Sequence, residues 1–420
     1  MRLLFINWYL KYNYYFPLII ALLLPFGVNY APIIALWIIA FFTININVKT
    51  QIVKAFQSKW LYVFWAFFAI HLIGYFFSNN KAEASWNIEI KINFLVLPFL
   101  ILATSFSKKE ILKIKLAFVL GCLLCLVYCM VRAIYLFYVE NLNSFSYSSF
   151  TYFLHPSYFA MYLLFAILIL LLSKKDELFF SKYVELKRII VILMFVVGII
   201  MASSKMGLIA LVLILPITVA FLLVANGYKK TVFAFIGLCV VSVFFAYKLF
   251  PTPFERFKVA LSVSESTEQI DVTSSESTAV RVLIWKQAIA IAKTNPLWGT
   301  TPGDVNDELF KSYKEHGLTG ALEKKLNTHN QFLQTYIGTG LFGFILLMTL
   351  TVGLSIFSIL KKNYLLLLFS LVIILNFLVE SMLQTQAGFT FFVFFSCILI
   401  AETVLKSTSN NSSFITHNSL

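Results

Sequence analysis

Residues 207–225 read GLIALVLILPITVAFLLVA, and within this run only Thr218 carries a polar side chain. A helix of about 20 apolar residues is long enough to cross the hydrocarbon layer of a membrane, which is about 30 Å thick. The run therefore predicts a transmembrane helix.

Apolar runs of comparable length recur from the first residues of the chain to the last, and we predict about twelve spans. Their expected bounds are 13–29, 31–47, 61–77, 89–106, 114–138, 156–173, 189–202, 207–225, 231–250, 330–358, 364–380 and 388–405. The predicted fold class is an all-α integral membrane protein with one large loop that contains short helices.

Composition and charge agree with a membrane protein. Of the 420 residues, 60% are hydrophobic and only 12% are charged, whereas soluble domains have about 25% charged residues. The formal net charge of +14 could suggest nucleic acid. With the N-terminus placed in the cytoplasm, however, the connections on that side carry the whole excess, which is the positive-inside pattern. We therefore expect cytoplasmic termini and no nucleic-acid partner.

The one long connection joins the ninth and tenth spans and is expected on the external side. It begins with Pro251 and continues to residue 277 as a polar stretch typical of a flexible linker. From Thr278 apolar residues recur at helical spacing until Asn295 and Pro296 end the pattern. A second short helix is predicted before Gly317. The expected organisation is spans one to nine in 1–250, the loop in 251–329, spans ten to twelve in 330–406 and a disordered cytoplasmic tail in 407–420.

Four ionisable residues are predicted at the external membrane boundary, where burying a charge is costly and usually has a purpose. Lys205 lies in the tight turn ASSKMG, where it is either a lysine that extends to the surface or a point charge for a phosphate. Arg281 opens a helix, the unfavourable end for a cation. It is either an exposed arginine or a bidentate ligand for an anion.

His329 stands where the loop meets the tenth span, beside Asn330, Gln331 and Gln334. These amides could orient sugar hydroxyls or the imidazole itself. Histidine accepts a proton near neutral pH, so His329 is a candidate general base. A structural histidine at the interface is the alternative.

Glu380 is predicted near the external end of the eleventh span, with Gln384 one turn further on. A carboxylate at this depth is expected to face a polar cavity, to pair with Lys205 or Arg281, or to orient His329. A functional role is favoured over a structural one.

Several short motifs occur in a fixed order along the second half of the chain. They are HPSYFAMY from His155, SSKMGL from residue 203, RVLIW from Arg281, WGTTPGD from residue 298, HNQFLQ from His329 and ESMLQTQ from Glu380. In this order, on a chain with about twelve predicted spans, they resemble the O-antigen ligase and polymerase superfamily. Members of that superfamily are integral-membrane enzymes that use polyprenyl-diphosphate glycans as donors.

The resemblance implies a catalytic role for His329, supported by Glu380, and contacts from Arg281 and Lys205 to the donor diphosphate. Lys205 replaces the arginine usual in the family, which keeps the charge and loses the bidentate fork. Substrate contacts are expected from Asn330, Gln331, Gln334, His155, Tyr158 and Gln384. The implied location is the bacterial inner membrane, with the site facing the periplasm.

The implied reaction moves a glycan from undecaprenyl diphosphate to a hydroxyl of lipid A-core or of another acceptor. Diphosphate is already a good leaving group, and the sequence has no Asp-x-Asp pair or dense external acidic cluster to bind Mg²⁺. We therefore expect no cofactor and no metal, and a single displacement with inversion. Membrane lipid is the other expected partner.

Two alternatives remain open. One is a glycan polymerase or a protein O-oligosaccharyltransferase of the same superfamily. The other is a transporter or flippase for lipid-linked sugars, which should bear polar groups near the bilayer midplane of several spans. The candidate residues here gather at one face beside a folded loop, which favours an enzyme.

Overall fold

The computed structural model describes residues 11–175, 183–228, 231, 273 and 278–417, and in this part of the chain all regular secondary structure is helical. The predicted all-α class is confirmed there. The predicted ninth span, 231–250, and the predicted linker, 251–277, fall outside the described residues except for Thr231 and Thr273.

The described helices fall into two series, one on each side of the linker. The first comprises α2 (Tyr15–Leu23), η1 (Leu24–Phe26), α3 (Ala31–Thr43), α4 (Val48–Gln57), α5 (Lys59–Phe77), α6 (Lys81–Lys91), α7 (Asn93–Ala103), α8 (Lys108–Val139), α9 (Tyr147–Phe150), α10 (Pro156–Leu172), α11 (Val184–Ala202) and α12 (Lys205–Ala225). The second comprises α15 (Thr278–Thr294), α16 (Val305–Glu315), α17 (Thr319–Glu323), α18 (Gln331–Met348), η4 (Thr349–Gly353), α19 (Leu354–Leu360), α20 (Tyr364–Phe377), η5 (Met382–Gln384) and α21 (Gln386–His417). Each predicted span outside 231–250 overlaps one of these helices or two or three consecutive ones.

Six helical stretches among the described residues are long and apolar enough to cross a membrane, or seven if α3 and α4, which meet at 116°, form one bent span. Shorter apolar helices, including α10 and α20, accompany them. The proposal of about twelve spans therefore rests on the shorter helices as well as the long ones.

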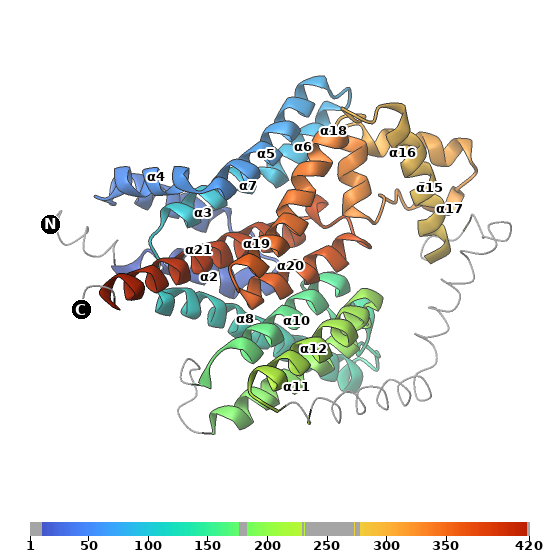
Figure 1. Cartoon of the computed structure of the whole chain (residues 1–420). Helices are drawn as coiled ribbons and strands as arrows, with labels where there is room; N and C mark the ends of the chain where they lie inside the picture. The colour runs from blue at the N-terminus through green and yellow to red at the C-terminus, as the bar shows by residue number, and fades with distance from the viewer. Residues whose placement is uncertain (1–10, 176–182, 229–230, 232–272, 274–277, 418–420) are drawn as a thin grey trace.

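Helix α10 packs against α8, α11, α12 and α20 and lies between α20 and α12 in the apolar bundle (Figure 1). Every side chain of α10 from Pro156 to Leu170 is buried. A helix that is apolar on every side is stable only when other helices or lipid enclose it. Phe165 of α10 meets Phe391 and Phe395 of α21 in an aromatic cluster that fixes the two helices together.

The loop helices form a second, smaller core. Ile284 and Ala288 of α15 pack with Leu309 and Tyr313 of α16, and Ile337 from the first half of α18 completes the cluster. Figure 1 shows α15, α16 and α17 together at one end of the molecule, opposite α4 and the C-terminal part of α21. The two loop helices predicted from apolar spacing and from Gly317 are thus present as α15 and α16.

Helix α18 is kinked at Gly340, where an uninterrupted span over 330–358 was predicted. Gly340 has a φ of 61°, and a Cβ placed there would lie 2.2 Å from the carbonyl oxygen of Leu297. The Leu297 segment therefore occupies the space that a side chain would need, and only glycine permits the approach. As a result, the first half of α18 belongs to the loop core and holds the residues after His329 at its start.

Candidate functional site

Glu380 is the centre of a cluster of side chains drawn from three distant parts of the chain. Its Oε2 lies 3.4 Å from Nδ1 of His329, and its Oε1 lies 3.5 Å from Nη2 of Arg281. The hydroxyl of Ser157 donates to Oε1 at 3.4 Å. Of the partners considered for Glu380 from the sequence, the structure brings both Arg281 and His329 to it.

The charges around Glu380 decide its protonation. Burial alone would raise the pKa of this carboxyl, but the hydrogen bond with His329 and the charge of Arg281 outweigh burial, so the pKa is lowered. Glu380 is therefore ionised at neutral pH. A carboxylate that accepts a hydrogen bond from one nitrogen of an imidazole fixes the ring orientation and leaves the other nitrogen for a substrate proton.

Arg281 projects from the first turn of α15 toward the segment that follows α20. Its Nη1 donates to the carbonyl oxygen of Val379 at 3.0 Å, and its side chain remains one-third exposed. A guanidinium has five N–H donors, so the contacts with Val379 and Glu380 leave donors for a ligand. Arg281 can hold an anion without leaving its place.

His329 occupies a strained backbone position between α17 and α18. Its φ is 46°, in the left-handed region that costs a residue other than glycine about 1–3 kcal/mol. Its N–H donates to Oδ1 of Asn327 at 2.9 Å, and the indole Nε1 of Trp285 donates to the preceding carbonyl, that of Thr328, at 2.8 Å. Strained backbone conformations that are held in place by several surrounding contacts cluster at functional sites.

The three amides beside His329 are buried and bonded to protein groups. Asn330 caps α18 and donates to the carbonyl oxygen of Leu378 at 3.1 Å. Gln331 accepts from the N–H of Leu383 at 2.7 Å, and Gln334 accepts from the hydroxyl of Thr328 at 2.9 Å. These amides hold the His329 turn against the Glu380 segment, so their geometry favours positioning over direct contact with sugar.

Ser157 and Ser204 were not singled out in the sequence, and they link two predicted motifs. Ser204 caps α12 and donates to Ser157 at 3.3 Å, and Ser157 in turn donates to Glu380. Lys205 is the first residue of α12 and its side chain is exposed. The hydroxyl chain therefore brings the start of α12, and with it Lys205, to the Glu380 side of the bundle.

His155 and Tyr158 stand at the start of α10. His155 accepts from the N–H of Ser157, and its ring centroid lies 6.0 Å from that of Tyr158. The pKa of His155 is lowered, chiefly by burial. The carboxylate of Glu380 acts to raise this pKa, and the charges of His329 and Arg281 act to lower it. His155 therefore interacts electrostatically with Glu380, His329 and Arg281. The ring of Tyr158 is buried.

Gln384 lies on another side of the site. It lines an interior hollow of about 10 Å³ together with Gln334, His71 and Asn87, and this volume is near the minimum for one water molecule. Through this hollow Gln384 lies beside His71 of α5 and Asn87 of α6.

The WGTTPGD motif attaches the loop to the connection between α5 and α6, a role that the sequence did not reveal. The carboxylate of Asp304 accepts from the N–H groups of Asn79 at 3.0 Å and Asn80 at 2.8 Å, and from the hydroxyl of Thr301 at 2.9 Å. Burial would raise the pKa of Asp304, but these hydrogen bonds and the charge of Lys81 lower it. Asp304 is therefore ionised at neutral pH.

Asp304→Asn should lower the stability of the folded protein by about 1–3 kcal/mol at neutral pH, because the partly buried hydrogen bonds from the N–H groups of Asn79 and Asn80 lose a charged acceptor. Since the folded-state pKa is lowered, the carboxylate contributes fully above the ordinary value of 3.8, and its contribution is lost as the pH falls through the folded-state value. Thermal unfolding in detergent at a series of pH values checks this. Asp307→Asn, at an exposed contact with Asn80, is the control. Equal melting temperatures for all three proteins at pH 7 would contradict it.

Comparison with known families gives a match to part of the chain. Residues 189–348 match the family model described as O-antigen ligase, and this range contains Lys205, Arg281 and His329. No curated protein matches the chain. Over this range the chain is similar to the O-antigen ligase family, and the match supports the resemblance to the O-antigen ligase and polymerase superfamily that the order of the motifs indicated.

Proposed function

We propose that the protein transfers a glycan from a polyprenyl-diphosphate donor to the hydroxyl of an acceptor, as a ligase on the periplasmic face of the bacterial inner membrane. The observation that carries this proposal is the shared contact of Glu380 with Arg281 and His329. Through this carboxylate, His329 as a proton acceptor and Arg281 as a cation for phosphate are held next to each other. The match to the O-antigen ligase family supports the same class of activity.

The proposed step is a single displacement. The acceptor oxygen attacks the anomeric carbon of the donor glycan, the bond from that carbon to the diphosphate oxygen breaks, and polyprenyl diphosphate leaves with the bonding electrons. His329 takes the proton of the acceptor hydroxyl. Arg281 and Lys205 stabilise the negative charge that grows on the diphosphate. Glu380 orients the imidazole and stabilises its protonated form.

Lys205 and Arg281 are not equivalent in this proposal. The fork of Arg281 fits two phosphate oxygens, whereas the ammonium of Lys205 acts as a point charge that need not be aligned. The resulting inversion at the anomeric carbon is what a displacement without a covalent enzyme intermediate gives. Tyr158 and His155 would contact sugar where the glycan reaches the start of α10, whereas Gln384 lies in the interior hollow beside α5 and α6.

Transfer by the purified, full-length protein tests the proposal. Given a lipid-linked glycan and an acceptor glycolipid in detergent, the protein should form the glycosylated acceptor and free polyprenyl diphosphate, and EDTA should leave the rate unchanged. No transfer, or transfer abolished by EDTA and restored by Mg²⁺, would refute this reaction.

A deletion strain separates a ligase from a polymerase. Loss of the capped acceptor with accumulation of long polyprenyl-linked chains is expected for the ligase proposed here. Accumulation of single-repeat glycan would instead show a polymerase, and loss of glycan from protein Ser or Thr would show an oligosaccharyltransferase.

A further inference from the structure

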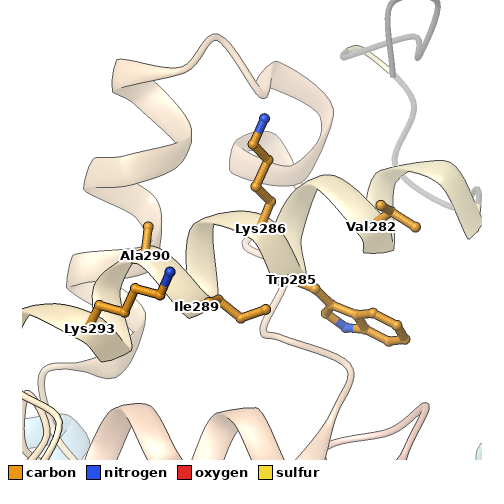
Figure 2. A pocket seen from close by; sticks show the side chains of 6 residues that line it. All are labelled: Val282, Trp285, Lys286, Ile289, Ala290 and Lys293. Atoms are coloured by element: carbon orange, nitrogen blue, oxygen red, sulfur yellow. The ribbon is translucent and has the colours of Figure 1, made fainter. Parts of the chain in front are cut away.

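A hollow of about 520 Å³ lies along the exposed flank of α15, outside the Glu380 cluster. Pockets for small molecules commonly enclose about 300–1,000 Å³. The residues that line it are Val282, Trp285, Lys286, Ile289, Ala290 and Lys293 (Figure 2).

The hollow combines an apolar floor with two cations. Figure 2 shows the nitrogen atoms of Lys286 and Lys293 directed to one side and the indole of Trp285 to the other, with Ile289 between Lys293 and Trp285. Lys286, Ile289 and Lys293 recur at the spacing of one helix face. Ile289 is 45% exposed and lies outside the loop core, which buries Ile284 and Ala288 of the same helix. The face therefore offers apolar contact and positive charge together.

The two lysines have no counter-charge within the described residues. No hydrogen bond or ion pair joins either ammonium to the rest of the described chain, and no carboxylate lines the hollow. By contrast, the carboxylate of Glu402 binds both Lys115 and Lys406. Among the described residues, no carboxylate neutralises the charge of the α15 face.

Trp285 connects this hollow to the candidate site. Its indole lines the hollow, and its Nε1 donates to the carbonyl oxygen of Thr328, the residue before His329. One turn earlier on the same helix, Arg281 contacts Glu380. Helix α15 therefore presents Arg281 to the Glu380 cluster and presents the hollow to a molecule that approaches from outside.

On the basis of the proposed transfer, we propose that the α15 hollow binds the acceptor and that this acceptor is an acidic saccharide. Its phosphate or carboxylate contacts Lys286 and Lys293, and a sugar ring packs on Trp285. Because the donor diphosphate is assigned to Arg281 and Lys205, the second cationic surface serves the second substrate. The bound acceptor extends along the indole of Trp285 toward His329.

The test is binding of a fluorescently labelled phosphorylated oligosaccharide to the full-length protein in detergent, measured by anisotropy, with the phosphatase-treated oligosaccharide as the neutral counterpart. The double variant Lys286→Glu, Lys293→Glu should bind the phosphorylated probe about tenfold more weakly. Lys311→Glu, Lys314→Glu, on α16 and outside the hollow, changes the same charge and should bind as the wild type does.

Binding is measured on the His329→Asn background as well, so that it does not depend on transfer. If the glutamate variant elutes as an aggregate, Lys286→Gln, Lys293→Gln replaces it, with an expected loss of about threefold. In transfer assays the same variants should raise the KM for the acidic acceptor and leave the KM for the donor unchanged.

Three results would overturn the inference. The first is equal binding by all variants, and the second is an equal loss of binding for the phosphorylated and the neutral probe. The third is a loss that the variants show only in binding to vesicles that contain anionic phospholipid, which would make the face a membrane contact. A wild-type protein that binds the acidic saccharide through these lysines but transfers no glycan would refute the proposed function and leave the surface assigned.

Discussion

His329→Asn should lower kcat for glycan transfer by about 10³-fold, because a positioned general base typically contributes about 10²–10⁴-fold. Asparagine is the informative replacement. His329 has a φ of 46°, and asparagine adopts the left-handed region more readily than other residues. The turn should therefore survive, while the side chain can no longer take a proton. Initial rates with purified protein at saturating donor and acceptor measure the effect.

Two matched variants separate chemistry from folding. His329→Ala adds backbone strain to the loss of the imidazole and should show the same kcat with a lower melting temperature. His316→Ala removes the other histidine of the loop, whose ring contacts the carbonyl oxygen of Ser312, and should leave kcat within about twofold. A His329→Asn protein with near-normal kcat would remove His329 from the mechanism.

The sequence predicted the helices well because membrane spans are set by local composition. A run such as 207–225 must be helical and about membrane length whatever it packs against. The kink at Gly340 escaped prediction, since it depends on the approach of the Leu297 carbonyl oxygen. Leu297 and Gly340 are too far apart in the sequence for a local pattern to reveal their contact.

The ionisable residues of the candidate site were selected from the sequence for a similar reason. Arg281, His329 and Glu380 each stood out because charge at a membrane boundary is costly. Their mutual arrangement joins positions that are far apart in the sequence, as in the contact between Arg281 and Glu380. The amides illustrate the limit, because Gln331 and Gln334 satisfy protein groups where sugar contacts were expected. A buried amide and a ligand-facing amide look the same in a motif.

Arg281→Ala should raise the KM for the donor by about 30-fold and lower kcat by about tenfold, because the diphosphate loses a bidentate ligand in the ground state and in the transition state. Arg281→Lys keeps the charge and should recover part of the KM effect and little of the kcat effect. Donor titrations at saturating acceptor, with the fluorescent lipid product as readout, give both constants.

Glu380→Gln keeps the shape of the side chain and removes the charge that holds both Arg281 and His329. We expect kcat to fall by about 10²-fold, since the imidazole loses the carboxylate that orients it. Glu323→Gln, at an exposed position of α17, is the charge-matched control. The double variant of Arg281→Ala and Glu380→Gln should lose less than the product of the two single losses, because residues that share a contact are not additive. If the two losses simply multiply, Glu380 and Arg281 act independently, and the shared contact seen here has no part in transfer.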